Sequence, residues 1–211
     1  IRCIEYSDSK MNYETDIYRT IEKPFEGELF KDKGSKFLGF AFPVQDEDQV
    51  RAHLVHLKSL HHKARHWCYA WRIGTEEIKY RSNDDGEPSN SAGQPILGQL
   101  LSFDVSNVLV VVVRYFGGVK LGVGGLISAY RTAAKFTLET SDIIKKTVDV
   151  ELTLTFEYEH MDRVMRIIKD RKLKIVSQKM ELNCVYTISV RKNEALFTKA
   201  AFENLRCLLI K

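Results

Sequence analysis

Proline, cysteine and long hydrophobic runs are all scarce in this sequence of 211 residues. It holds 4 Pro, 12 Gly and 4 Cys, while 44% of its residues are hydrophobic and 28% are charged. So little Pro and Gly beside so large a hydrophobic share excludes collagen-like and disordered classes and indicates a chain that buries a core. The cysteines, at positions 3, 68, 184 and 207, are widely separated and include no Cys-x-x-Cys pair, so no disulfide framework is expected.

No stretch of the sequence is apolar enough to cross a membrane. The longest apolar run, Val108–Val113, has six residues, whereas a membrane-spanning helix needs roughly 20. The first residues also lack the basic start, apolar middle and small-residue cleavage site of a signal peptide. We therefore expect a cytoplasmic protein with no membrane partner, and its length allows two small domains.

The net charge of +4 is modest and unevenly distributed. Residues 1–140 hold 18 Lys and Arg against 18 Asp and Glu, while residues 141–211 hold 14 against 10. A strongly basic chain would point to nucleic acid as the partner, but a local basic patch can hide within a modest total. Charge alone therefore leaves the partner open.

The hydrophobic pattern predicts an N-terminal arm and then a first α+β domain. Residues 1–24 show no clear period and end at Pro24, so we interpret them as the arm. Residues 25–141 alternate between the period of two that is typical of strands and the spacing of three or four that is typical of helices. The expected strands are 26–31, 36–42, 66–73, 78–81 and 108–113, and the expected helices begin near Asp46, at Pro95 and at Leu126. The β-branched run from Val108 predicts a central strand covered on both faces.

Residues 142–211 follow a different order. Strand, helix, strand, strand, helix and strand succeed one another, which is the ferredoxin-like order. We therefore expect an α+β protein in which an N-terminal α/β sandwich is followed, near residue 142, by a C-terminal ferredoxin-like domain.

Between the central strand and the next helix lies a segment rich in glycine. Backbone N–H groups freed by glycine, together with the helix dipole, favour binding of a phosphate or carboxylate. The segment matches neither the Walker loop nor the dinucleotide-binding fingerprint, and close packing of the helix on the sheet explains the glycines equally well. The candidate ligand- or anion-binding residues are Arg114, Tyr115, Gly117, Gly118, Lys120, Gly122, Gly124 and Gly125.

Residues 82–93 have no apolar side chain larger than Ala or Pro, which predicts a surface loop. Its acidic part consists of Asp84, Asp85, Glu87 and Ser89. Carboxylates there can hold magnesium if the loop folds toward the glycines, although a solvated turn is the favoured interpretation because the calcium-loop spacing is absent. We expect no metal site and no cofactor, with magnesium as an option only for a nucleotide-binding function.

Aromatic and basic residues also alternate near the central strand. Such residues suit the stacking of unpaired RNA bases, with packing in the core as the alternative. The candidates for stacking are Tyr69, Trp71, Arg72 and Phe116. His66 and Cys68 share a strand face without a second pair of ligands, so no zinc site is expected. Cys68 is an unsuitable nucleophile because bulky aromatic neighbours raise the pKa of a thiol, and no catalytic residue is predicted.

Two motifs resemble the signature of the YigZ/IMPACT family. One is the segment from Arg114 to Tyr130, and the other combines Asp84–Ser89 with Ala92–Leu97. The resemblance extends from about Glu26 to Glu139, and the tail is similar to the extra domain of bacterial members. It implies a first domain similar to the second domain of ribosomal small-subunit protein five, and a second domain similar to domain V of elongation factor G.

Both of those relatives touch ribosomal RNA, and eukaryotic family members act in translational control. The resemblance therefore favours a non-enzymatic regulator that binds RNA, the ribosome or a translation factor. The same fold occurs in small-molecule kinases whose glycine loop holds phosphate, so a phosphate-ligand or nucleotide-binding enzyme or sensor is the alternative, and a protein-docking scaffold is a third hypothesis. Asn90-Ser91 replaces the usual Gly-Thr, and Ser128 stands where the family often has a basic residue, which weakens the expected anion site.

Overall fold

The computed structural model describes residues 16–205 and 208–210. It divides into two compact units, of which the first is Tyr18–Lys146. The second combines the described residues before Tyr18 with those from Thr147 onward. Both units contain sheets and helices, so the expected α+β class is confirmed.

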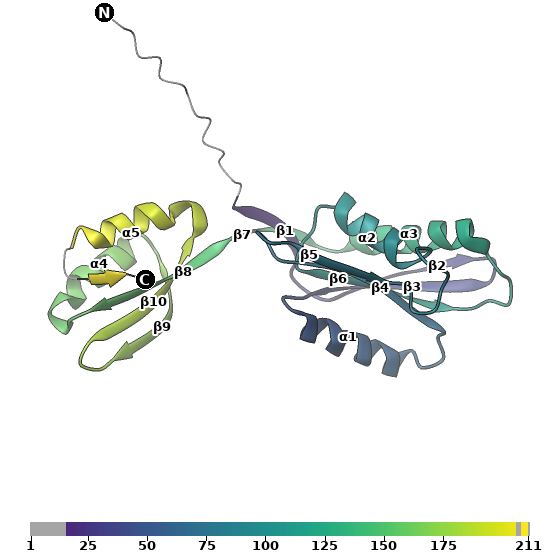
Figure 1. Ribbon diagram of the computed structural model, residues 1–211, viewed down its shortest axis with the longest axis horizontal. Helices are drawn as coiled ribbons and strands as arrows, with labels where there is room; N and C mark the ends of the chain where they lie inside the picture. Colours follow the sequence, from purple (N-terminus) through teal and green to yellow (C-terminus); the bar gives the residue numbers. More distant parts are fainter. Residues whose placement is uncertain (1–15, 206–207, 211) are drawn as a thin grey trace, which may run out of the picture. The chain divides into compact units, whose positions relative to one another are not determined.

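The first unit is built on a five-stranded antiparallel sheet with helices on both faces (Figure 1). Its strands, in the spatial order β2-β3-β6-β4-β5, are β2 (Phe25–Asp32), β3 (Ser35–Pro43), β6 (Val108–Tyr115), β4 (His66–Ile73) and β5 (Lys79–Asn83). Helix α1 (Glu47–Leu60) covers one face, while α2 (Gly93–Ser102) and α3 (Gly122–Thr140) cover the other.

Strand β6 occupies the centre of this sheet, as its sequence predicts. The even-numbered residues from Val108 to Val112 pack with α2 and α3, and the odd-numbered residues from Leu109 to Val113 pack with α1. Continuous β-branched runs are typical of parallel sheets, whose two faces are both covered by helices. This sheet is antiparallel, but helices cover both of its faces as well. The strand therefore needs apolar side chains at every position.

Two helix starts differ in how they are formed. Helix α1 begins where expected, because the Asp46 side chain accepts a hydrogen bond from the Gln49 N–H at 2.8 Å. Helix α3 begins at Gly122, four residues before the Leu126 that the sequence favours. Glycine has low helix propensity, which hid this first turn from the pattern. The first turn of α3 is flanked by Leu121 and Leu126, which are both buried in the core.

A short two-stranded sheet was not expected. Strand β1 (Ile17–Ile21) pairs with β7 (Ile143–Thr147), so part of the segment interpreted as an arm is structured. Ile21 is buried in the core of the first unit, and the Arg19 carbonyl accepts a hydrogen bond from the Ser106 N–H. The compact unit therefore reaches beyond the expected limits of 25–141 at both ends, while residues 1–15 of the expected arm lie outside the described residues.

The second unit has the ferredoxin-like order that the sequence predicts. Its elements are β8 (Asp149–Phe156), α4 (Met161–Asp170), β9 (Lys174–Met180), β10 (Cys184–Arg191), α5 (Ala195–Glu203) and β11 (Leu208–Ile210), and the spatial order of the strands is β11-β8-β10-β9. Alternate residues of β10 are buried, from Cys184 to Val190, because the helices cover one face of this sheet. The core also includes Leu154, Val164 and Phe202.

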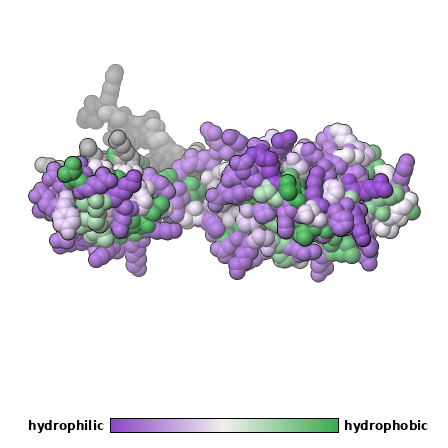
Figure 2. Space-filling view, turned by 90° about the horizontal axis from the view of Figure 1, so that it is seen from below, coloured by the Kyte–Doolittle hydropathy of each residue, from purple (hydrophilic) through white to green (hydrophobic). Residues whose placement is uncertain are grey.

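The surface on the side of α1 is mostly hydrophilic, with small separate hydrophobic patches (Figure 2). Within the part of the chain that the structure describes, no helix combines the length and the hydrophobicity of a membrane span. Cys68 and Cys184 are buried free thiols, while Cys3 and Cys207 lie outside the described residues.

Candidate functional site

The register of the first sheet brings three strand ends together. Strand β4 runs antiparallel to β6 and sets His66 opposite Arg114. Strand β3 runs antiparallel to β6 on its other side and sets Lys36 opposite Tyr115. Ser35 therefore lies at the same end of the sheet as His66 and Arg114. The side chains of Ser35, His66 and Arg114 at this end of the sheet face α2 and α3, and the glycine segment begins there.

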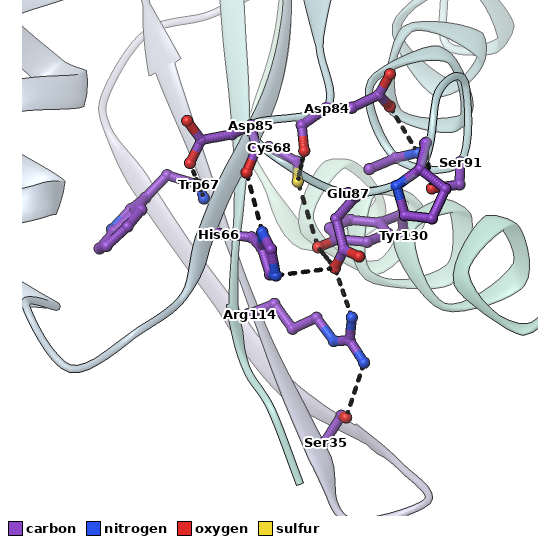
Figure 3. A network of polar contacts seen from close by, with 12 residues as sticks. Ser35, His66, Trp67, Cys68, Asp84, Asp85, Glu87, Ser91, Arg114 and Tyr130 are labelled. Carbon is purple, nitrogen blue, oxygen red and sulfur yellow. Dashed lines mark hydrogen bonds and ion pairs between the residues drawn. The ribbon is translucent and has the colours of Figure 1, made fainter. Parts of the chain in front are cut away.

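Glu87 is the centre of a buried polar network at this end of the sheet (Figure 3). Its Oε1 accepts hydrogen bonds from Arg114 Nη1 at 2.5 Å and from the Tyr130 hydroxyl at 2.8 Å, and His66 Nε2 lies 3.9 Å away. The side chains of Glu87 and Arg114 are only 4% and 5% exposed. Arg114, a candidate for anion binding, is thus the partner of a buried carboxylate.

The two aspartates of the acidic loop bind different parts of the backbone. The Asp84 carboxylate accepts hydrogen bonds from the N–H groups of Asn90, Ala92 and Gly93, which holds the start of α2. Asp85 Oδ2 accepts a hydrogen bond from the Trp67 N–H at 2.8 Å. The loop is therefore fastened to the sheet and to a helix, unlike the solvated turn that the sequence favoured.

The acidic residues do not form a cluster of metal ligands. Among residues 16–205 and 208–210, no three side chains of His, Cys, Asp or Glu are grouped so that they could hold a metal ion. Ser89, the fourth candidate of this loop, is exposed to solvent.

Cys68 contributes to the same network as a neutral thiol. Its Sγ lies 3.0 Å from the Asp84 carbonyl oxygen and 3.3 Å from the Tyr130 hydroxyl. Burial raises the pKa of the Cys68 thiol far above its ordinary value and also raises the pKa of Tyr130. The prediction that Cys68 is no nucleophile agrees with this environment.

The glycines serve different purposes. Gly117 packs against Gly34, where a Cβ atom would lie 1.9 Å from the Gly34 carbonyl carbon, and its N–H donates to Ser35 Oγ at 3.2 Å. Gly118 and Gly122 have φ angles of +87° and +74°, which favour glycine, and nothing lies within 4 Å of a Cβ added at either. Gly124 also borders open space, but without a positive φ angle.

The acidic and glycine segments meet at a pocket of about 330 Å³, which we call the α3 pocket. Its lining residues are Glu87, Pro88, Arg114, Phe116, Lys120, Leu121, Gly122, Val123 and Leu126. Among the described residues, no side chain caps the N-terminus of α3. The pocket therefore combines the positive end of a 19-residue helix with Lys120 and the Glu87–Arg114 pair.

The aromatic candidates separate into two groups. Phe116 lines the α3 pocket and is 46% exposed. Trp71 is buried among residues that pack with α1, and Tyr69 is partly buried beside it, so core packing, the alternative interpretation, accounts for both. Arg72 pairs with Val108 in the sheet register, at the end opposite Arg114, and donates a hydrogen bond to Asp104.

Tyr115 and a further pocket lie on the other side of the sheet. The Tyr115 hydroxyl is 2.9 Å from His61 Nδ1, and its ring packs with the α1 side of the core. A pocket of about 250 Å³ on that side is lined mainly by apolar residues, among them Phe25, Phe40 and Leu60. Neither sequence motif contributes to it.

Sequence reasoning missed three members of the network. Ser35 and His66 face α2 and α3, and Tyr130 is fully buried in α3. Their role depends on contacts with residues 19 to 79 positions away along the chain. The period of two along β4 and β6 was the one available signal, since it places His66, Cys68 and Arg114 on one face.

Comparison with known proteins identifies the family. Residues 33–138 match the Impact N-terminal domain. The chain belongs to the IMPACT family. The IMPACT family member YigZ of Escherichia coli (strain K12) is 33% identical over 147 residues, which cover 69% of this chain and 72% of that protein. The Protein IMPACT homolog of Saccharomyces cerevisiae (strain ATCC 204508 / S288c) is 43% identical over 108 residues, or 47% of this chain and 41% of that protein.

The likeness to a solved structure extends beyond the matched domain. A solved structure described as the crystal structure of an hypothetical protein covers 93% of this chain and 97% of its own, with 25% identity and a TM-score of 0.72. Both sequence motifs fall inside residues 33–138, so the α3 pocket is formed by the IMPACT domain itself.

Proposed function

We propose that this IMPACT family member binds RNA in the translation machinery, with a phosphate group seated in the α3 pocket. The observation that carries the proposal is the uncapped N-terminus of α3, which lies beside Lys120 and a buried Arg114. In the part of the chain that the structure describes, Arg114 Nε has no hydrogen-bond partner. The translational role that the family resemblance implies for eukaryotic members supports the same choice. A role in translation would place the protein in the cytoplasm.

The chemistry of the pocket suits a phosphate. The first N–H groups of a helix have no partner within the helix and carry partial positive charge, so they favour an anion. Gly122 and Gly124 leave the backbone there uncovered, because a Cβ added at either would meet open space. Lys120 is exposed and adds a full positive charge at the rim. The phosphate therefore meets backbone donors and a cation together.

A titration of single-stranded RNA by fluorescence anisotropy tests the proposal. Binding should weaken as the salt concentration rises, because Lys and Arg release counterions from the phosphates. Lys120→Ala should weaken binding to every sequence and reduce the salt slope by about one. Lys135→Ala, which removes an exposed charge from the far part of α3, is the matched control and should change little. Absence of binding at low salt, or equal effects of the two variants, would refute the proposal.

The size of the pocket favours a second candidate, a nucleotide-binding enzyme or sensor. A volume of about 330 Å³ lies within the range of small-molecule sites, roughly 300 to 1,000 Å³. Asp84, Asp85 and Glu87 are all engaged by protein donors, so we expect any stabilisation by nucleotides to be independent of magnesium. A thermal-shift series with nucleotides, with and without magnesium, measures this. A nucleotide that stabilises the protein strongly while single-stranded RNA does not bind would favour this second candidate.

A further inference from the structure

The α3 pocket contains an acceptor that a phosphate cannot use. Glu87 Oε1 accepts hydrogen bonds from Arg114 and Tyr130, but Oε2 has no hydrogen-bond partner among the described residues. Glu87 lines the pocket, and its side chain is 4% exposed. A carboxylate oxygen that lines a pocket favours an N–H or O–H donor and repels an anion. We therefore expect a phosphate at the rim, beside Lys120, and a different chemical group next to Glu87.

The walls of the pocket suit a flat apolar body. Apart from Glu87, Arg114 and Lys120, the side chains that line it are apolar, and they are Pro88, Phe116, Leu121, Val123 and Leu126. The Arg114 guanidinium carbon lies 5.5 Å from the centre of the Phe116 ring. Phe116 nevertheless remains 46% exposed, which leaves ring surface for a ligand. An aromatic ring and a guanidinium are the groups on which unpaired bases stack.

We propose that the α3 pocket admits one unpaired base that carries an exocyclic amino group, with the amino N–H donated to Glu87 Oε2 and the ring against Phe116. This rests on the proposed RNA-binding function and adds a preference among bases. Adenine, cytosine and guanine have such an amino group. Uracil places a carbonyl oxygen where cytosine carries its amino group, and two acceptors that face each other repel. The attached phosphate lies at the rim with Lys120 and the start of α3.

A comparison of two RNA octamers of equal charge tests the preference, one of cytidine and one of uridine. We expect the cytidine octamer to bind about tenfold more tightly, because a hydrogen bond to a charged group is worth at least about 1.4 kcal/mol, which is a factor of ten. Phe116→Ala should weaken binding of the cytidine octamer by about tenfold, the loss expected for one stacked base. Phe136 also has a half-exposed ring, but it lies within α3 and outside the pocket, so Phe136→Ala should leave binding unchanged.

Glu87→Gln adds a third measurement. Its amide keeps the shape of the carboxylate without the charge, so the ratio of cytidine to uridine affinities should fall toward one. If this buried substitution prevents folding, the octamer comparison and the Phe116→Ala variant still decide.

The possible failures are distinguishable. Equal affinity for the two octamers, with the Lys120→Ala effect retained, would overturn the base preference and leave RNA binding intact. Equal effects of Phe116→Ala and Phe136→Ala would also overturn it. Absence of binding to both octamers at low salt would overturn the preference and the RNA-binding proposal together.

Discussion

At the scale of single residues, the Glu87–Arg114 pair combines structural and binding roles. Both side chains are almost fully buried, and Tyr130 and Ser35 provide further hydrogen bonds. Removing one partner of a buried ion pair leaves the other charge uncompensated in a medium of low polarity. The network therefore holds the acidic loop in place while it forms one wall of the α3 pocket.

Glu87→Gln should lower the free energy of unfolding of the first unit by about 3 to 5 kcal/mol, the usual cost of breaking a buried ion pair from one side. Urea denaturation followed by tryptophan fluorescence measures this, because Trp67 and Trp71 both lie in the first unit. Glu139→Gln disrupts the exposed pair with Lys135 and should cost less than about 0.5 kcal/mol. Similar small losses in both variants would show that the buried pair contributes no more than a surface one.

At the scale of elements, the first turn of α3 contains three glycines, which have low helix propensity. Glycine within a helix costs about 0.5 to 1 kcal/mol relative to alanine. Gly122 has a positive φ angle that explains the residue, but Gly124 has none, and a Cβ atom there would meet open space. Packing and backbone geometry therefore give no reason for Gly124, whereas close approach of a ligand to the backbone does.

Gly124→Ala should raise the stability of the first unit by about 0.5 to 1 kcal/mol and weaken RNA binding about tenfold, because a methyl group hinders contact between phosphate and the N–H groups. Gly98→Ala in α2 is the control, since a Cβ there also meets open space without a positive φ angle. It should give a similar gain in stability with unchanged binding. If both variants bind RNA as the unchanged protein does, Gly124 has no part in ligand approach.

The elements also show what the sequence could predict. Strand β6 and helix α1 were predictable because their signals are local, a β-branched run in one and an Asp46 cap in the other. Strands β1 and β7 were not, because each is five residues long and pairs with a segment more than 100 residues away. The Glu87–Arg114 pair was missed because it joins residues 27 positions apart through the fold of the loop, which no local pattern reveals.

At the scale of the whole molecule, the second unit is completed by a residue from the N-terminal side of the chain. Asp16 is 3% exposed and accepts hydrogen bonds from Arg191 Nε at 2.7 Å and Nη2 at 2.9 Å. Its backbone carbonyl also accepts a hydrogen bond from the Val148 N–H. A segment that precedes the first unit in sequence is thereby tied to the second unit, which the order of the elements alone does not reveal.

This contact should make the stability of the second unit depend on pH. The hydrogen bond from Arg191 holds the pKa of Asp16 below its ordinary value of 3.8. Because the folded state favours the charged carboxylate, the contribution of Asp16 to stability is complete above pH 4 and is lost as the pH falls through the lowered pKa of the folded state.

Asp16→Asn should therefore destabilise the second unit at pH 7, and the difference from the unchanged protein should shrink below pH 4. Urea denaturation followed by circular dichroism measures it, with tryptophan fluorescence as the internal control for the first unit. A difference that stays constant from pH 7 to pH 3 would show that the charge of Asp16 contributes nothing.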